Sequence, residues 1–197
     1  VGGMGLRRID VHDVDVGEVV ASALRACDVV LICVPTPLTD NSPDLGYIER
    51  AGHSVAASLR GGVLVVLEST TYPGTTEEVL RPILEASGLR AGRDFALAYS
   101  PERIDPGREL DHIAKTPRIV GGLTKGDGEL AARFYRSFIH EVELVSTPRE
   151  AEMAKLIENT FRNVNSALVN ELAFLSRDLD VDLWEAIRAA STKPYGF

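Results

Sequence analysis

The feature that most constrains the fold is an alternation of short apolar runs with amphipathic segments of helix length. The runs are too short for buried helices and rich in β-branched residues, so each is predicted to be a buried strand. They lie at residues 28–34, 63–67, 95–99, 118–120 and 142–145, with predicted helices at 45–59, 75–86 and 127–138. Strands that alternate with helices predict an α/β fold with a mostly parallel, doubly wound sheet.

The pattern changes at Pro148, after which apolar residues keep helical spacing without an intervening glycine or proline. They are Met153, Ile157, Phe161, Val164, Leu168, Leu172, Leu175 and Leu179. One helix of this length, roughly 45 Å, is too long to cover a single sheet, so we expect it to link domains or pair with another subunit. We place a domain boundary near Thr147-Pro148, separating residues 1–147 from 148–197, and predict a shorter helix at 183–190 after Asp182.

Composition excludes several classes of function. The net charge of -8 disfavours nucleic acid as a partner. No run approaches the ~18 apolar residues that span a bilayer, and the N-terminus lacks the pattern of a signal peptide, so a cytoplasmic location is expected. The four histidines are scattered, and no metal site is predicted. Cys27 and Cys33 are predicted to be free, buried thiols.

Three polar segments follow predicted strands, where open α/β sheets bind their ligands. They read V-P-T-P at 34–37, E-S-T-T-Y-P-G-T-T at 68–76 and S-P-E-R-I-D-P-G at 100–107. Hydroxyls at a strand-to-helix junction can position an anion or a water, and a carboxylate can serve as a general base. The structural alternatives are a proline-stiffened turn, a helix capped by Thr75 or Thr76, and a surface turn held by a pair between Glu102 and Arg103.

A fourth polar group lies on the predicted long helix. Lys155 and Asn159 are four residues apart and therefore share a helix face, which Asn163 continues. A lysine and an amide stacked in this way can hold a developing oxyanion together with a water. A solvated polar stripe would produce the same pattern.

The order of these segments and their residue sequences together resemble the UDP-glucose/GDP-mannose dehydrogenase family, from about Ala26 to Phe197. The matching motifs are V-P-T-P, S-T-x-x-x-G at 69–74, S-P-E at 100–102, K-L-x-x-N at 155–159 and T-K-P-Y-G-F at 192–197. The sequences of segments 68–76 and 100–107 resemble those of the family branch that acts on UDP-N-acetylglucosamine and UDP-N-acetylmannosamine. The resemblance implies a Rossmann-like sheet followed by the long helix of a central dimerisation domain.

Members of this family oxidise the sugar 6-hydroxyl to a carboxylate with NAD, and a cysteine holds the intermediate. The resemblance implies that Thr70 and Glu102 order a water and assist proton transfer, while Lys155 and Asn159 stabilise the oxyanion. The implied NAD-binding residues are Val34, Pro35, Thr36, Ser69 and Thr70. The implied UDP-sugar-binding residues are Glu102, Arg103, Asp105, Lys155 and Asn159. The helix at 150–180 would build a homodimer.

Two family features have no match here. The first missing feature is the G-x-G-x-x-G turn that cradles the pyrophosphate, because Gly2-Gly3-Met4-Gly5 is too short to replace it. The nucleophilic cysteine is the other, since Cys27 and Cys33 belong to a different part of the family's fold. We therefore expect 1–147 to be the remainder of an NAD-binding domain without its first βαβ unit, and 148–197 the start of the central domain. Both would be parts of a longer enzyme, inactive alone.

Three other interpretations stay open. The chain could be a catalytically inactive remnant that only dimerises through the long helix. It could be a fragment of a β-hydroxyacid-type dehydrogenase, since those enzymes share a helical K-x-x-N. It could also be a purely structural α/β domain.

Overall fold

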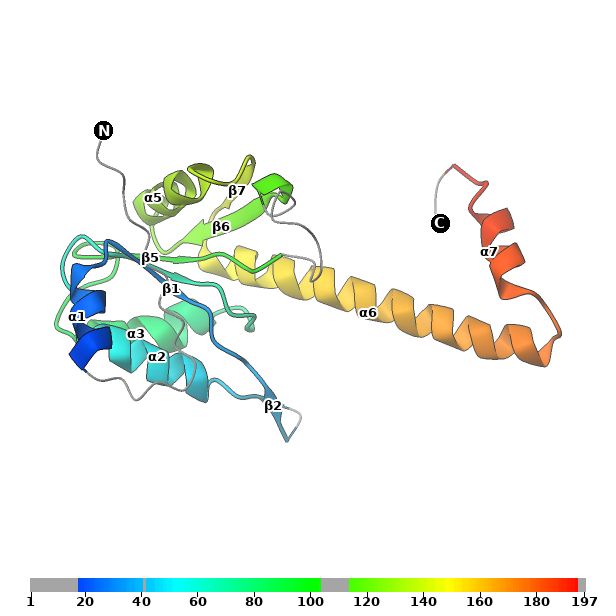
Figure 1. Ribbon diagram of the computed structural model, residues 1–197, viewed down its shortest axis with the longest axis horizontal. Helices are drawn as coiled ribbons and strands as arrows, with labels where there is room; N and C mark the ends of the chain where they lie inside the picture. The colour runs from blue at the N-terminus through cyan, green and yellow to red at the C-terminus, as the bar shows by residue number, and fades with distance from the viewer. Residues whose placement is uncertain (1–17, 41, 104–113, 195–197) are drawn as a thin grey trace. The chain divides into compact units, whose positions relative to one another are not determined.

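The computed structural model describes residues 18–40, 42–103 and 114–194 (Figure 1). The chain divides into two compact units, Val1–Lys155 and Leu156–Phe197. The first unit holds the sheet and the helices packed on it. The second holds most of one long helix and a shorter one.

The sheet of the first unit has five strands in the order β1-β4-β5-β6-β7. Their bounds are Val29–Ile32 for β1, Leu64–Leu67 for β4, Ala96–Tyr99 for β5, Arg118–Gly122 for β6 and Val142–Val145 for β7. Every neighbouring pair is parallel except β5 and β6, which are antiparallel. The predicted mostly parallel α/β sheet is confirmed, with a reversal of direction at β6. A small antiparallel pair, β2 (Leu38–Thr39) and β3 (Ser42–Pro43), lies where only a loop was predicted.

Helices connect the strands, and all but α1 lie near predicted positions. They are α1 (Glu18–Ala26), α2 (Gly46–Ala56), the π-helical turn η1 (Thr76–Leu80) continuing into α3 (Arg81–Glu85), and α5 (Lys125–Arg136). The predicted capping by Thr75 or Thr76 is wrong. Thr75 occupies the N-cap position but makes no capping bond, and its hydroxyl donates to the Tyr72 carbonyl instead. The donors at this helix start are satisfied by Glu152, far along the chain.

The core lies on both faces of the sheet, because successive side chains of a strand point to opposite sides. Val65 and Leu67 of β4 join a cluster with residues of α2 and α3 on one face. Leu64 and Val66 join a cluster with residues of α5 on the other. All four are at most 2% exposed. Figure 1 shows α2 and α3 on one side of the strands and α5 on the other, which is the doubly wound arrangement.

The long helix α6 runs over Pro148–Asp178, as the apolar spacing predicts. Its first two turns, 148–155, belong to the first unit, and the rest belongs to the second. In the second unit, α7 (Leu183–Ala190) begins at Asp182, whose carboxylate caps the amides of Trp184 and Glu185. Within the part of the chain that the structure describes, no helix combines the length and apolar character that crossing a bilayer requires.

The cysteines are free, but the prediction that both are buried is wrong. Cys27 is partly buried and Cys33 is exposed. Cys33 comes directly after β1, at the edge of the sheet where the chain leaves the core.

Candidate active site

Three loops meet at one edge of the sheet because β1, β4 and β5 are parallel and end in register. Ile32 pairs with Leu67, and Leu67 pairs with Tyr99. The segments that begin at Cys33, Glu68 and Ser100 therefore leave adjacent strands side by side. The described starts of the three polar segments, up to Arg103 in the third, therefore lie at the carboxyl edge of the sheet.

Hydrogen bonds hold the first two loops together. The Val34 amide donates to the Ser69 hydroxyl at 2.9 Å, and that hydroxyl donates to the Val34 carbonyl at 2.8 Å. The Thr36 hydroxyl donates to the Thr70 carbonyl at 2.8 Å. Four of the five residues predicted to bind the cofactor are thus in contact, and the fifth, Pro35, is exposed between them. The hydroxyls of Ser69 and Thr36 are thus engaged between the two loops.

A buried arginine that sequence reasoning missed organises the third loop. Arg118 begins β6, and continuing the antiparallel register of β5 and β6 places it opposite Glu102. Its Nη2 lies 2.6 Å from Glu68 Oε1, its Nη1 lies 2.9 Å from Glu102 Oε2, and its Nε donates to the Ser100 hydroxyl at 3.0 Å. The Arg118 side chain is 8% exposed and that of Glu68 is 9% exposed. The only sequence signal was a charged residue at the start of a buried strand.

The charges of this cluster reinforce one another. Burial by itself would lower the pKa of Arg118, but the carboxylates of Glu68 and Glu102 outweigh it and raise that pKa above its usual value. Tyr135 of α5 donates its hydroxyl to Glu68. Burial, aided by Glu68, raises the pKa of Tyr135. Arg118 therefore stays charged and Tyr135 stays protonated, so the Glu102 carboxylate is held beside a permanent cation. The carboxylate of Glu102 is thus paired with a cation 16 residues along the chain.

Cys33 contacts this cluster. Its thiol donates to Glu68 Oε2 at 3.5 Å. Although the residue as a whole is exposed, desolvation of the thiol at this contact and the neighbouring Glu68 carboxylate raise the pKa of Cys33 to about 12. Since the thiolate is the reactive form, a thiol with this pKa is a poor nucleophile at neutral pH.

The first two turns of α6 bring Lys155 to the same edge. The Lys155 ammonium donates to the backbone carbonyl of Glu102, so two residues of the predicted catalytic set are in contact. Arg103 donates to the Pro117 carbonyl at 2.7 Å, which anchors the S-P-E loop to the start of β6. Asp105 lies outside the described residues.

Asn159 belongs to the second unit, where its Oδ1 accepts from Arg162 at 2.5 Å. The structure thus joins Glu102 to Lys155 and Thr36 to Thr70, and a single pocket that includes Asn159 stays a prediction. Over residues 18–40, 42–103 and 114–194, no group of three or more His, Cys, Asp or Glu side chains is arranged to hold a metal ion.

Comparison with known proteins identifies the family. Residues 10–139 match the NAD binding domain of the UDP-glucose/GDP-mannose dehydrogenase family. Residues 149–197 match the central domain of the same family. The chain belongs to the UDP-glucose/GDP-mannose dehydrogenase family.

Among its curated relatives is the UDP-N-acetyl-D-mannosamine dehydrogenase of Pyrococcus horikoshii, which is 45% identical over 171 residues, covering 87% of this chain and 41% of the relative. The UDP-N-acetyl-D-glucosamine 6-dehydrogenase of Pseudomonas aeruginosa is 40% identical, covering 86% of this chain and 41% of the relative. A solved structure of the UDP-D-ManNAc dehydrogenase from Pyrococcus horikoshii superposes with a TM-score of 0.85 at 44% identity, covering 89% of this chain and 42% of that one. The chain spans about two fifths of the length of these relatives.

Proposed function

We propose that this chain forms part of an NAD-dependent dehydrogenase that oxidises the 6-hydroxyl of a UDP-sugar to a carboxylate, with a UDP-N-acetylhexosamine as the favoured substrate. The observation that carries the proposal is the contact between Lys155 and the Glu102 carbonyl. It joins the K-L-x-x-N helix to the S-P-E loop across 53 residues of sequence, at the edge where α/β sheets bind ligands.

The carboxyl edge of β1 and β4 fits one part of NAD. Three hydrogen bonds tie the two loops together, with Pro35 exposed and Thr70 partly buried. Val34, Pro35, Thr36, Ser69 and Thr70 would hold the cofactor there. When bound, NAD supplies the acceptor for the hydride that leaves the sugar carbon. The bonds between the loops and their position at the ends of β1 and β4 support this role.

The chemistry assigned to the chain's own residues follows from their charge. Lys155 would stabilise the negative charge that develops on the sugar oxygen, and Asn159 would donate a hydrogen bond to the same oxygen. Glu102, held beside Arg118, would order a water, and Thr70 would assist it from the neighbouring loop. Glu102, Arg103, Asp105, Lys155 and Asn159 would contact the sugar nucleotide.

The choice of substrate rests on the relatives. Those above are named as dehydrogenases of UDP-N-acetylmannosamine and UDP-N-acetylglucosamine. The chain spans about two fifths of the length of these relatives. We therefore propose that turnover needs the remainder of such an enzyme and that the 197 residues alone are inactive.

We also propose that the helix at 150–180 builds a homodimer. Its apolar side chains beyond Lys155 are solvent-exposed in the single chain, with Ile157 61%, Phe161 71% and Val164 62% exposed. A contiguous apolar stripe of this kind marks an interaction surface. A second copy would present the same stripe, as a symmetric dimer requires.

The proposed activity can be tested in an enzyme restored to full length. The aligned stretch of this chain would replace its counterpart in the Pyrococcus horikoshii relative, and NADH formation would be followed with UDP-N-acetylmannosamine and UDP-N-acetylglucosamine. We expect turnover with at least one of them, and Lys155→Met should lower kcat by about 10²-fold or more because it removes the charge at the developing oxyanion.

The matched control is Lys125→Met on α5. Lys125 is 88% exposed and forms a long surface pair with Glu129, so kcat should stay within about twofold. A folded chimera without UDP-sugar-dependent NADH formation would refute the proposal. So would Lys155→Met with the turnover of the parent.

A further inference from the structure

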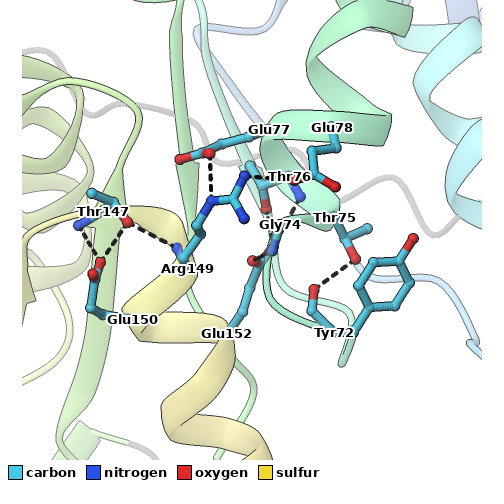
Figure 2. A network of polar contacts seen from close by, with 10 residues as sticks. All are labelled: Tyr72, Gly74, Thr75, Thr76, Glu77, Glu78, Thr147, Arg149, Glu150 and Glu152. Carbon is cyan, nitrogen blue, oxygen red and sulfur yellow. Dashed lines mark hydrogen bonds and ion pairs between the residues drawn. The ribbon is translucent and has the colours of Figure 1, made fainter.

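Glu152 is a carboxylate buried completely within the first unit, at the second turn of α6. Its Oε2 accepts a hydrogen bond from the Gly74 amide at 2.5 Å. Its Oε1 accepts from the Thr76 amide at 2.9 Å and from the Thr76 hydroxyl at 2.7 Å. Figure 2 shows these bonds converging from the turn between β4 and η1 onto one side chain of α6. All three donors come from the segment that contains Thr70.

A buried carboxylate from a distant part of the chain is an energetically costly acceptor for the amides at a helix start. A threonine or aspartate at the N-cap would satisfy the same amides locally. Here Thr75 is in that position but bonds to Tyr72, and the acceptor comes from 76 residues away. Burial raises the pKa of Glu152, and the bonds from Thr76 and Gly74 oppose that rise. A local cap would satisfy the amides but could not connect the turn to α6. The buried carboxylate of Glu152 does both.

The backbone of the turn is shaped for this contact. Gly74 has a φ of 107°, in the region that side-chain-bearing residues rarely adopt. In this conformation its amide donates to Glu152 Oε2. The bond therefore links the geometry of the turn to the position of the Glu152 side chain.

Lys155 lies on the same face of α6, one turn after Glu152. Glu152 holds the turn that follows Thr70, and Lys155 contacts the Glu102 carbonyl of the next loop. One turn before Glu152, Arg149 pairs with Glu77 at 2.8 Å and with Glu78 at 2.6 Å. Three side chains at intervals of three residues thus connect one helix to both loops.

We propose that Glu152 is a positioning residue for the dehydrogenase reaction: by binding the 72–76 turn, it sets the distance between Thr70 on that loop and Lys155 on α6. Glu152 itself contacts neither substrate nor cofactor. The inference rests on the proposed function. Its physical basis is that catalytic groups must be held within about 0.5 Å of their working geometry, and that a shift of about 1 Å can lower turnover about 10²-fold.

The test uses the full-length chimera described above and the variant Glu152→Gln. The amide can still accept the bonds from Thr76, but its NH2 group opposes the Gly74 amide, so the turn shifts. We expect kcat to fall by about tenfold or more while KM for NAD and for the UDP-sugar stays within about threefold. A role in folding alone would lower the unfolding midpoint and leave kcat of the folded enzyme unchanged.

Glu150→Gln is the matched control, two residues away on the same helix. It removes the same charge from an exposed carboxylate that accepts from Thr147, a bond that glutamine can keep. Its kcat should stay within about twofold. If Glu152→Gln does not yield folded enzyme, Glu152→Asp decides by the same thresholds, since it keeps the charge and shortens the reach.

The possible failures are distinguishable. If Lys155→Met lowers kcat but Glu152→Gln or its aspartate substitute does not, the proposed function stands and the positioning role is overturned. If Lys155→Met leaves kcat unchanged, the proposed function fails first and the inference with it. A fall in kcat for Glu150→Gln equal to that for Glu152→Gln would also overturn it, because the effect would then follow the charge of α6 and not the contact with the turn.

Discussion

The central strands of the first unit and the later turns of α6 in the second are both rich in leucine and valine, yet their exposure is opposite. Leu64, Val65, Val66 and Leu67 of β4 are between 0% and 2% exposed. Phe161 and Leu168 of α6 are 71% and 54% exposed. Apolar content is therefore not what decides burial in this chain. The strands have partner strands and helices on both faces within the described structure, whereas the later part of α6 presents its apolar face outward.

The polar residues of the two regions differ in the same way. In the first unit, Arg118, Glu68 and Glu152 are buried and bonded to partners far along the chain. In the second, Arg177 pairs with its neighbour Asp178 at the surface. Long-range polar contacts thus lie at the candidate active-site edge, whereas the pair between Arg177 and Asp178 is local.

Removing one charge from each region tests this difference most directly. Arg118→Met leaves Glu68 buried beside no cation and should lower the free energy of unfolding by about 3–5 kcal/mol. Arg177→Met removes an exposed pair, with side chains 72% and 69% exposed, and should change it by less than about 1 kcal/mol. Urea unfolding of the 197-residue chain measures both. Equal effects would show that burial does not separate the two regions.

A second comparison concerns apolar side chains of equal size. Leu97→Ala empties a position that is fully buried in β5 and should lower the free energy of unfolding by about 2–5 kcal/mol. Leu168→Ala should change it by less than about 0.5 kcal/mol at concentrations where the chain is monomeric.

The same leucine variant sharpens the proposal for the dimer. If the stripe on α6 pairs with a second copy, Leu168→Ala should raise the dimer dissociation constant about tenfold, equivalent to ~1.4 kcal/mol, in sedimentation experiments. Leu97→Ala is the reference for a variant that changes stability without touching that surface. Unchanged self-association in Leu168→Ala would argue against the dimer through this helix.

The last prediction concerns Cys33, an exposed residue of the first unit. Because the pKa of Cys33 is raised to about 12, its alkylation by iodoacetamide at about pH 8 should be roughly tenfold or more slower than in the unfolded chain. The rate should keep rising as the pH passes about 9, since the thiolate fraction still increases there. Peptide-resolved mass spectrometry separates Cys33 from Cys27. Equal rates in folded and unfolded chains would contradict the contact with Glu68.

Much of the fold could be predicted from local pattern. Strand β7 lies at the predicted residues, α7 begins after Asp182, and α6 runs for the predicted length. The candidate site was predictable to the extent that it depends on strand ends, because parallel strands place their carboxyl ends at one edge. The exposure of Cys33 was mispredicted because apolar neighbours in sequence do not reveal where a strand leaves the core.

The sequence by itself determined the order of the five main strands and of the helices after the first, the polar loops after three strands and the residue set that matches the family. The tertiary structure alone decided which distant side chains contact those loops. Arg118 reaches Glu102 only because β6 runs antiparallel to β5, and Glu152 reaches Gly74 only because α6 starts beside that turn. Periodicity reports the environment of a residue within a few positions. A contact between residues 16 or 78 positions apart depends on how whole elements pack, so local spacing does not encode it.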